Sequence, residues 1–344
     1  MRADYHRRQA RIGYVWHPAL SYAAAYTIFA LAVKLSAGTA TADPIAFVLM
    51  FCIGALPPST WAVHRGMQRR SLRKGPSVRW HLANSVSGTA TLVIVMTTVG
   101  AYLVDGVTIL FALLLMRLGV IMMAPVLDLV FGRHVRPAAW LAFMICVSAA
   151  AYGLTGQSFA ALPPISLTIL VTYLAAYAVR LALMTHQTKN RDRAARGDWF
   201  LVEMMMTALA LAVVCLIIFV GLASTNQLST LTFQMPSIIA GLAYGYALVN
   251  GTLIYLDWRE NAHSVTINRA ASLVAGLTAS LIGSVAFGFI WPSSDQWVLA
   301  ALTASALVIL GWETLTALSH RSGDLSFEDE QRRDPLELSA ESEL

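Results

Sequence analysis

The sequence predicts an all-α integral membrane protein in which ten transmembrane helices form two inverted-topology five-helix repeats. Three observations lead to this fold class: the apolar composition, ten long apolar segments, and cations that recur at similar places in both halves of the chain. Apolar residues make up 57% of the 344 residues and charged residues 12%. This charged share is about half that of a soluble globular domain.

Ten segments have the length and apolar character that a helix needs to cross a hydrocarbon core of about 30 Å. They cover residues 18–36, 44–63, 82–104, 107–131, 137–155, 164–185, 199–223, 235–256, 265–290 and 297–319. The fourth segment leads to Gly132 and a short basic connection containing proline, which predicts a helix end there. The pair Pro57-Pro58 inside the second segment predicts a kink or an interruption.

The cations indicate how these helices are oriented. Of the 24 Lys and Arg, 20 lie in the two terminal tails and in the connections 64–81, 132–136, 186–198 and 257–264. By the positive-inside rule these regions are cytoplasmic, so we expect a multi-pass protein of the bacterial inner (plasma) membrane with both termini inside. The net charge of +5 is then a topology signal, and we expect no nucleic-acid partner.

The second half of the chain repeats features of the first. AYTIFALAVKL in the first segment is similar to TYLAAYAVRL in the sixth, which places Lys34 and Arg180 146 residues apart. Arg117 and Arg269 are 152 residues apart, each in a span that leads to a proline-containing connection. Because five helices is an odd number, the second half enters the membrane inverted, an architecture typical of alternating-access transporters.

These features define four regions of the chain. A basic cytoplasmic N-terminal tail, 1–17, precedes the first five-helix repeat, 18–155. The second repeat, 164–320, is followed by an acidic tail, 321–344, which we expect to be disordered and cytoplasmic.

Two stretches resemble a known family. APVLDLVFGRHVRPAAW at the end of the fourth span and VTINRAASLVAGLTASLIGSVAFGFIWPSSDQW in the second half are similar to EamA-like members of the drug/metabolite transporter superfamily, over roughly residues 18–320. The family often has Glu-Arg in the turn after the fourth helix, whereas this chain has Gly132-Arg133, with Asp128 one turn earlier. The resemblance implies transport of small metabolites, a class that includes amino acids, amines, sugars, nucleotide sugars, phosphorylated intermediates and lipid-linked sugars.

Four cations lie within the predicted spans, where a charge normally faces a polar interior or a partner and not lipid. Arg117 is the leading candidate for a substrate contact or gate, because it lies two to three turns inside its span. Arg269, Lys34 and Arg180 lie nearer to span ends, where their side chains can also reach the interface. A structural salt bridge is the competing role for each of them.

Three acids lie in apolar context: Asp128, Glu203 and Glu313. Either glutamate could neutralise Arg180 or Arg269 as an inner gate, or carry a coupling proton.

The eighth span contributes further candidates. Tyr244, Tyr246 and Asn250 could line a cavity, and by helical spacing Tyr246 and Asn250 share a face. Gly241-x-x-x-Gly245 in the same span is a close-packing face that serves either contacts within the fold or a homodimer, and the homodimer is left open.

No catalytic constellation or metal-ligand spacing is found in the sequence, so we expect no enzyme activity, no cofactor and no metal. Cys52, Cys146 and Cys215 have no paired spacing and are interpreted as small apolar residues. Four embedded cations against fewer acids favour an anionic ligand. The sequence therefore predicts a secondary or facilitated transporter of a small phosphorylated or carboxylated metabolite, whose partners are that substrate and membrane lipids. The alternatives are a flippase for a lipid-linked phosphate and a non-transporting scaffold or accessory subunit.

Overall fold

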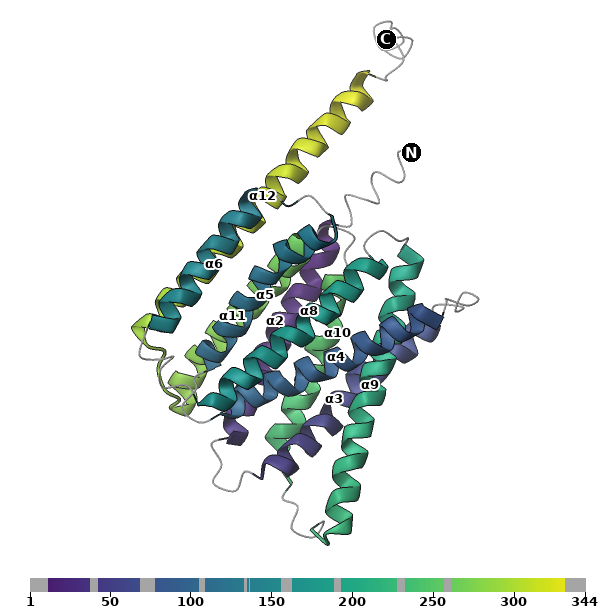
Figure 1. Cartoon of the computed structure of the whole chain (residues 1–344), viewed down its shortest axis with the longest axis vertical. Helices are drawn as coiled ribbons and strands as arrows, with labels where there is room; N and C mark the ends of the chain where they lie inside the picture. Colours follow the sequence, from purple (N-terminus) through teal and green to yellow (C-terminus); the bar gives the residue numbers. More distant parts are fainter. Residues whose placement is uncertain are drawn as a thin grey trace, which may run out of the picture.

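The computed structural model describes residues 12–37, 43–68, 78–104, 109–132, 135, 137–155, 163–188, 193–227, 233–256 and 261–331. Every regular element in these ranges is an α-helix (Figure 1). The helices are α2 (Ile12–Ala37), α3 (Pro44–Gln68), α4 (Val78–Leu103), α5 (Ile109–Val130), α6 (Pro137–Thr155), α8 (Pro164–Thr188), α9 (Arg193–Ser224), α10 (Met235–Tyr255), α11 (Asn261–Phe287) and α12 (Ser294–Gln331). Each of the ten predicted spans overlaps one of these helices.

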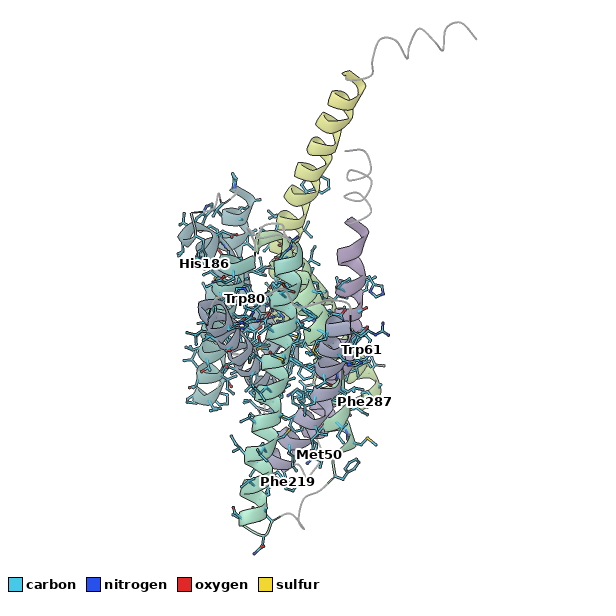
Figure 2. The ribbon with its side chains drawn as sticks, turned by 90° about the vertical axis from the view of Figure 1, so that its right-hand side faces the viewer. Met50, Trp61, Trp80, His186, Phe219 and Phe287 are labelled. Carbon is cyan, nitrogen blue, oxygen red and sulfur yellow. The ribbon has the colours of Figure 1, made fainter. Side chains whose placement is uncertain are left out.

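The described helices have the dimensions of membrane spans. Nine of them are long and apolar enough to cross a bilayer, and the apolar part of α6, Pro137–Tyr152, is shorter. Large apolar side chains lie on the outside of the bundle, among them Trp61, Phe219 and Phe287, each about half exposed (Figure 2). An apolar outer surface of this extent requires lipid around it. The chain is therefore a multi-pass membrane protein, as predicted.

Proline and glycine mark many of the helix ends. α3, α6 and α8 begin at a proline, whose missing N–H has no partner in a first turn anyway. α5 ends in a turn at Gly132, where φ is 65°, and α11 is followed by Gly288 with φ of 68°. Glycine adopts this left-handed conformation without a Cβ penalty. The predicted end of the fourth helix at Gly132 is confirmed.

The helices are arranged as a central group with two flanks (Figure 1). α2, α4, α8 and α10 form the centre, in which α10 packs against α2, and α4 packs against α8. On one side α3 and α9 pack against each other, with α3 also touching α10 and α9 touching α4. On the other side α5 packs against α11, and α6 against α12 at the edge of the molecule.

The contacts of the first five helices correspond to those of the last five. α11 packs on α2 as α5 packs on α8, and α5 touches α6 as α11 touches α12. Three further contacts join helices that have the same position in each set of five: α3 with α9, α5 with α11, and α6 with α12.

The backbones of α3 and α10 come into close contact where the two helices cross. A Cβ added at Gly241 would lie 2.0 Å from the carbonyl oxygen of Phe51, and one added at Gly54 would lie 2.2 Å from that of Ile238. Gly245 faces Ala55 in the same crossing. The glycine motif of α10 is thus used for packing inside the fold.

Three features differ from the sequence-based expectations. α3 runs through Pro57 and Pro58 as one helix, so of the two predicted effects, a kink or an interruption, the interruption does not occur. α12 continues as a helix past His320 to Gln331, into the tail expected to be disordered, because extending an existing helix needs no new nucleus. Cys52 on α3 and Cys215 on α9, which have no paired spacing in the sequence, lie near each other.

Candidate functional site

Three arginines are buried where the central helices meet α5 and α11. Arg117 on α5, Arg180 on α8 and Arg269 on α11 are 2%, 4% and 0% exposed. Each comes from a different helix, and tyrosines from α2, α8 and α10 surround them. Burying a guanidinium among apolar helices is costly unless polar groups satisfy it. The partners of these three side chains therefore define the site.

One tyrosine oxygen joins two of the arginines. Arg117 donates from Nη1 to the hydroxyl of Tyr173 at 3.1 Å, and Arg269 donates from Nη1 to the same oxygen at 3.3 Å. Tyr173 lies on α8 and is 1% exposed. Two like charges are thus held side by side on one neutral acceptor.

Each of these arginines also has an aromatic partner. The guanidinium carbon of Arg117 lies 5.1 Å from the ring centroid of Tyr26, and that of Arg269 lies 4.5 Å from the centroid of Tyr177. A cation over the face of a tyrosine ring is stabilised by about 0.5–2 kcal/mol, and the larger values apply where water is excluded. This contact stabilises the charges without neutralising them.

The tyrosines around the two arginines recur at corresponding positions, although Nη2 of Arg269 also donates to the Tyr255 hydroxyl at 2.8 Å, whereas Nη2 of Arg117 has no acceptor among the described residues. The Tyr26 hydroxyl is hydrogen-bonded to that of Tyr102 at 3.2 Å, and the Tyr177 hydroxyl donates to that of Tyr255 at 3.1 Å. Tyr177 follows Tyr26 by 151 residues, and Tyr255 follows Tyr102 by 153. A further pair, Tyr22 and Tyr173, is also 151 residues apart and contacts Tyr26 and Tyr177 respectively. Both halves thus supply one arginine and three tyrosines in similar relative places.

Arg180 has a different environment. Its Nε donates to Oε1 of Glu203 at 2.8 Å, and its Nη2 donates to the Thr252 hydroxyl at 2.8 Å. Glu203 is fully buried, and Oε1 also accepts from Ser87 at 2.9 Å and Thr91 at 3.3 Å. Trp199 Nε1 donates to Oε2 at 3.2 Å. The ion pair therefore links α4 to α8 and α9.

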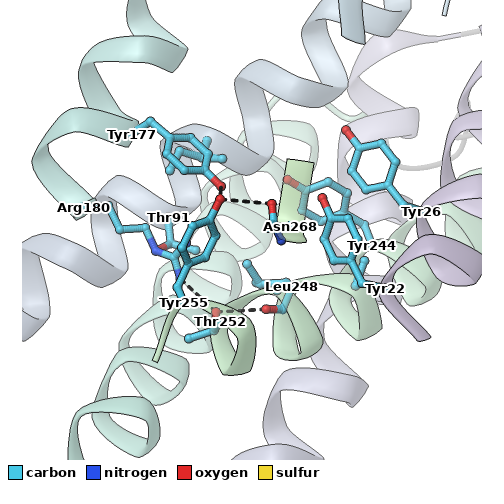
Figure 3. Close-up of a pocket in the computed structure, with 13 residues that line it drawn as sticks. Tyr22, Tyr26, Thr91, Tyr177, Arg180, Tyr244, Leu248, Thr252, Tyr255 and Asn268 are labelled. Carbon is cyan, nitrogen blue, oxygen red and sulfur yellow. Dashed lines mark hydrogen bonds between the residues drawn. The ribbon is translucent and has the colours of Figure 1, made fainter. Parts of the chain in front are cut away.

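A small cavity lies beside this ion pair, with a volume of about 30 Å³. Tyrosines from three helices and the Arg180 side chain face it (Figure 3). Its walls are Tyr22, Tyr26, Thr91, Ile94, Tyr177, Arg180, Tyr244, Ala247, Leu248, Gly251, Thr252, Tyr255 and Asn268. Arg117 and Arg269 are not on this wall, but each stacks on a tyrosine that is. The cavity holds about one or two water molecules and no metabolite.

Positive charge and unused donors characterise the site. Of the described side chains in contact with the three arginines, Glu203 is the one carboxylate. Nε and Nη2 of Arg117 and Nε of Arg269 are buried and have no acceptor among the described residues. A buried donor without an acceptor costs about 1–3 kcal/mol. This arrangement can accept an anion that supplies both the oxygens and the charge.

The structure separates the other predicted site residues from this cluster. Lys34 is half-buried in the last turn of α2, and the 151-residue spacing of the tyrosine pairs matches Arg180 with Phe29 and not with Lys34. Tyr246 is 42% exposed on the outside of α10 and not in the cavity. Asn250 is buried, but its amide donates to the Tyr246 carbonyl.

Two acids are placed elsewhere. Asp128 is buried on α5, eleven residues after Arg117 and so about 16 Å along the helix. Glu313 lies on α12, and its side chain falls outside the described part of the chain. In the part of the chain that the structure describes, no three His, Cys, Asp or Glu side chains are grouped so that they could hold a metal ion.

Tyr244 lies in the cavity wall, as predicted, but the other tyrosines of the cluster are residues that sequence reasoning missed. Tyr22 and Tyr26 are four residues apart on α2, and Tyr173 and Tyr177 repeat that spacing on α8. Such a spacing puts both rings of a pair on one helix face. The repeat of the pair after 151 residues was the signal that could have found them.

Comparisons with known proteins do not assign this site to a family. No family model matches the chain, and no curated protein matches it. The arginine–tyrosine cluster thus has to be interpreted from its own geometry.

Proposed function

We propose that this chain is a secondary or facilitated transporter that moves a small anionic metabolite, phosphorylated or carboxylated, across a membrane by alternating access. The observation that carries the proposal is the buried arginine cluster. Three guanidiniums meet a single carboxylate among the described contacts, and three of their nitrogens have no acceptor. A structural role alone would favour paired and fully satisfied charges.

The position of the cluster supports transport. Arg117 comes from the first set of five helices and Arg269 from the second, and they share the Tyr173 hydroxyl between them. In transporters built from repeats, the substrate site lies where the repeats meet. A charge at such a site is attracted to an anion much more strongly than it would be in water, because the dielectric constant is low.

Two sets of correspondences support an inverted repeat. Three of the five equivalent helix pairs pack against each other, namely α3 with α9, α5 with α11 and α6 with α12, and the Arg–Tyr groups recur after 151 to 153 residues. With five helices in each half, equivalent helices run in opposite directions through the membrane. One site can then be enclosed from either side by equivalent sets of helices. This arrangement also agrees with the proposed membership of the drug/metabolite transporter superfamily, EamA-like group.

The size of the cavity supports a closed conformation. Ligand pockets for metabolites are typically about 300–1,000 Å³, whereas this cavity is about 30 Å³. Binding therefore requires the two halves to move apart. The distribution of Lys and Arg supports an inner-membrane orientation with both termini in the cytoplasm.

The test is a ligand screen by thermal stability of the purified protein. We expect glucose 6-phosphate, succinate or a related anion to raise the unfolding temperature, because a ligand that binds the native state stabilises it by mass action. Choline serves as the cationic control, and undecaprenyl phosphate tests the flippase alternative. A stabilising anion should then be taken up by proteoliposomes. A protein that responds to no compound and co-purifies with a stoichiometric partner would be an accessory subunit instead.

A further inference from the structure

The ion pair between Arg180 and Glu203 breaks the correspondence between the two halves. Counting back 151 residues from Arg180 gives Phe29, and counting forward 153 from Thr91 gives Tyr244. Phe29 and Tyr244 pack edge-to-face with centroids 4.6 Å apart, and Phe51 contacts both rings. The place that corresponds to the ion pair is therefore occupied by an aromatic cluster of Phe29, Phe51 and Tyr244. The ion pair has no counterpart at the corresponding positions of the other repeat. This asymmetry indicates a role at only one side of the site.

Glu203 occupies only one of the three guanidinium nitrogens of Arg180. The carboxylate accepts from Nε, the Thr252 hydroxyl accepts from Nη2, and Nη1 makes no hydrogen bond to a described residue. Arg180 is also the arginine on the cavity wall. Guanidinium binds carboxylate or phosphate best when two of its nitrogens donate in parallel. An anion in the cavity can form that arrangement by taking the place of Glu203.

Glu203 does not depend on Arg180 alone. Ser87 and Thr91 from α4 and Trp199 from its own helix α9 donate to its carboxylate. These three donors remain near the carboxylate if Arg180 turns away, so the released charge keeps hydrogen-bond partners. Losing Arg180 as a partner is therefore less costly than it would be for an otherwise unsatisfied buried carboxylate.

We propose that Glu203 is a built-in competitor for the transported anion: it holds Arg180 and joins α4 to α8 and α9 while the site is empty, and the anionic group of the substrate displaces it from Arg180. The inference rests on the proposed function, because it needs an anionic substrate. When the substrate displaces Glu203 from Arg180, it also breaks the link between α4 and helices α8 and α9. Substrate binding and the separation of these helices therefore occur together. Arg180 is then a direct substrate contact, and Glu203 controls when that contact is free.

The test compares anion affinity and transport in Glu203 variants, with inorganic phosphate as the first probe and the most stabilising anion of the screen as the second. Glu203→Gln keeps the shape and removes the charge, and we expect phosphate to bind about tenfold more tightly, the size of one lost charge-assisted competitor. Glu203→Asp keeps the charge on a shorter side chain, and we expect an intermediate affinity. Both variants should transport more slowly than the wild type at saturating anion, because the empty site recloses poorly.

Asp128→Asn is the matched control. It removes another buried carboxylate and makes the same change in net charge, but neither hydrogen-bond partner of Arg180 is Asp128. Its phosphate affinity should equal that of the wild type. A Glu203→Gln protein that binds phosphate no more tightly than wild type would overturn the competitor role and leave anion transport standing. If the wild type and all variants bind neither probe, the proposed function itself fails.

Discussion

Arg117 and Arg269 lie 152 residues apart in the sequence and donate to one oxygen, the hydroxyl of Tyr173, over 3.1 Å and 3.3 Å. Their charges repel, and the shared acceptor is neutral. The pair is therefore held in place by the packing of α5 against α11, by the Tyr26 and Tyr177 rings, and by the hydrogen bond from Arg269 to the Tyr255 hydroxyl. Energy stored in such a pair is released when an anion binds between the guanidiniums.

Replacing either arginine should abolish the response to anions. Arg117→Ala and Arg269→Ala each remove a charge-assisted donor of about 1.5–3 kcal/mol, so we expect at least a tenfold loss of affinity. Expression should stay near that of the wild type, because each change also relieves like-charge repulsion. Lys34→Ala is the control, since Lys34 lies in the last turn of α2 outside the cluster, and its effect should be smaller. Normal anion binding and transport by both arginine variants would contradict the role of the cluster.

Tyr173→Phe should lower the stability of the ligand-free protein and have less effect on the stability of the anion-bound protein. The change removes the oxygen that accepts from both arginines, at a cost of about 1–3 kcal/mol for each donor left without an acceptor. An anion supplies new acceptors, so the ligand-induced rise in unfolding temperature should be larger than in the wild type.

Tyr102→Phe is the control for this experiment. It also removes a buried hydroxyl, but that hydroxyl bonds Tyr26 and no arginine. Its ligand-induced rise should match the wild type, and an equal rise in both variants would argue against the special place of Tyr173.

The helices could be predicted from the sequence because a membrane leaves a chain few choices. Each spanning segment has to satisfy its own backbone hydrogen bonds, so a long apolar run predicts a helix almost directly. The charged members of the site could be found in the same way, since Arg117, Arg180, Arg269 and Glu203 stand out in apolar runs. Their partners could not be assigned, and the sequence left Arg180 and Arg269 as equal choices for Glu203.

The faces of the helices were harder to predict. In a soluble helix the polar residues mark the outside, but lipid and protein interior are both apolar, so the pattern carries little information. This is why the sequence offers both Tyr244 and Tyr246 for the cavity, although Tyr246 faces outward and only Tyr244 lines the wall. The spacing of Tyr244, Leu248, Gly251 and Tyr255 follows one helical face, and only the structure identifies that face as the inner one.

The close crossing of α3 and α10 should be intolerant of any side chain at Gly241. A Cβ there would lie 2.0 Å from the Phe51 carbonyl oxygen, a backbone atom that can move only with its helix. We expect Gly241→Ala to lower the thermal stability in detergent, by about 1–3 kcal/mol as for other overpacked cores. Gly311→Ala on α12 is the control, because nothing lies within 4 Å of its added Cβ. That change should be neutral or stabilise by about 0.5–1 kcal/mol, and equal losses in both variants would disagree with the packing described here.

The orientation of the helices can be tested with single cysteines in the connections. Each variant is built in a Cys52→Ala, Cys146→Ala, Cys215→Ala background, so that the introduced thiol is the only one. Ser71→Cys lies in the basic connection after α3, and Thr41→Cys in the cation-free connection before it. Because cationic connections stay in the cytoplasm, an impermeant maleimide should label Thr41→Cys in intact spheroplasts and Ser71→Cys only after lysis. The reverse pattern would contradict the orientation inferred from the cations, with both termini in the cytoplasm. Labelling of both in intact spheroplasts would mean that α3 does not cross the membrane.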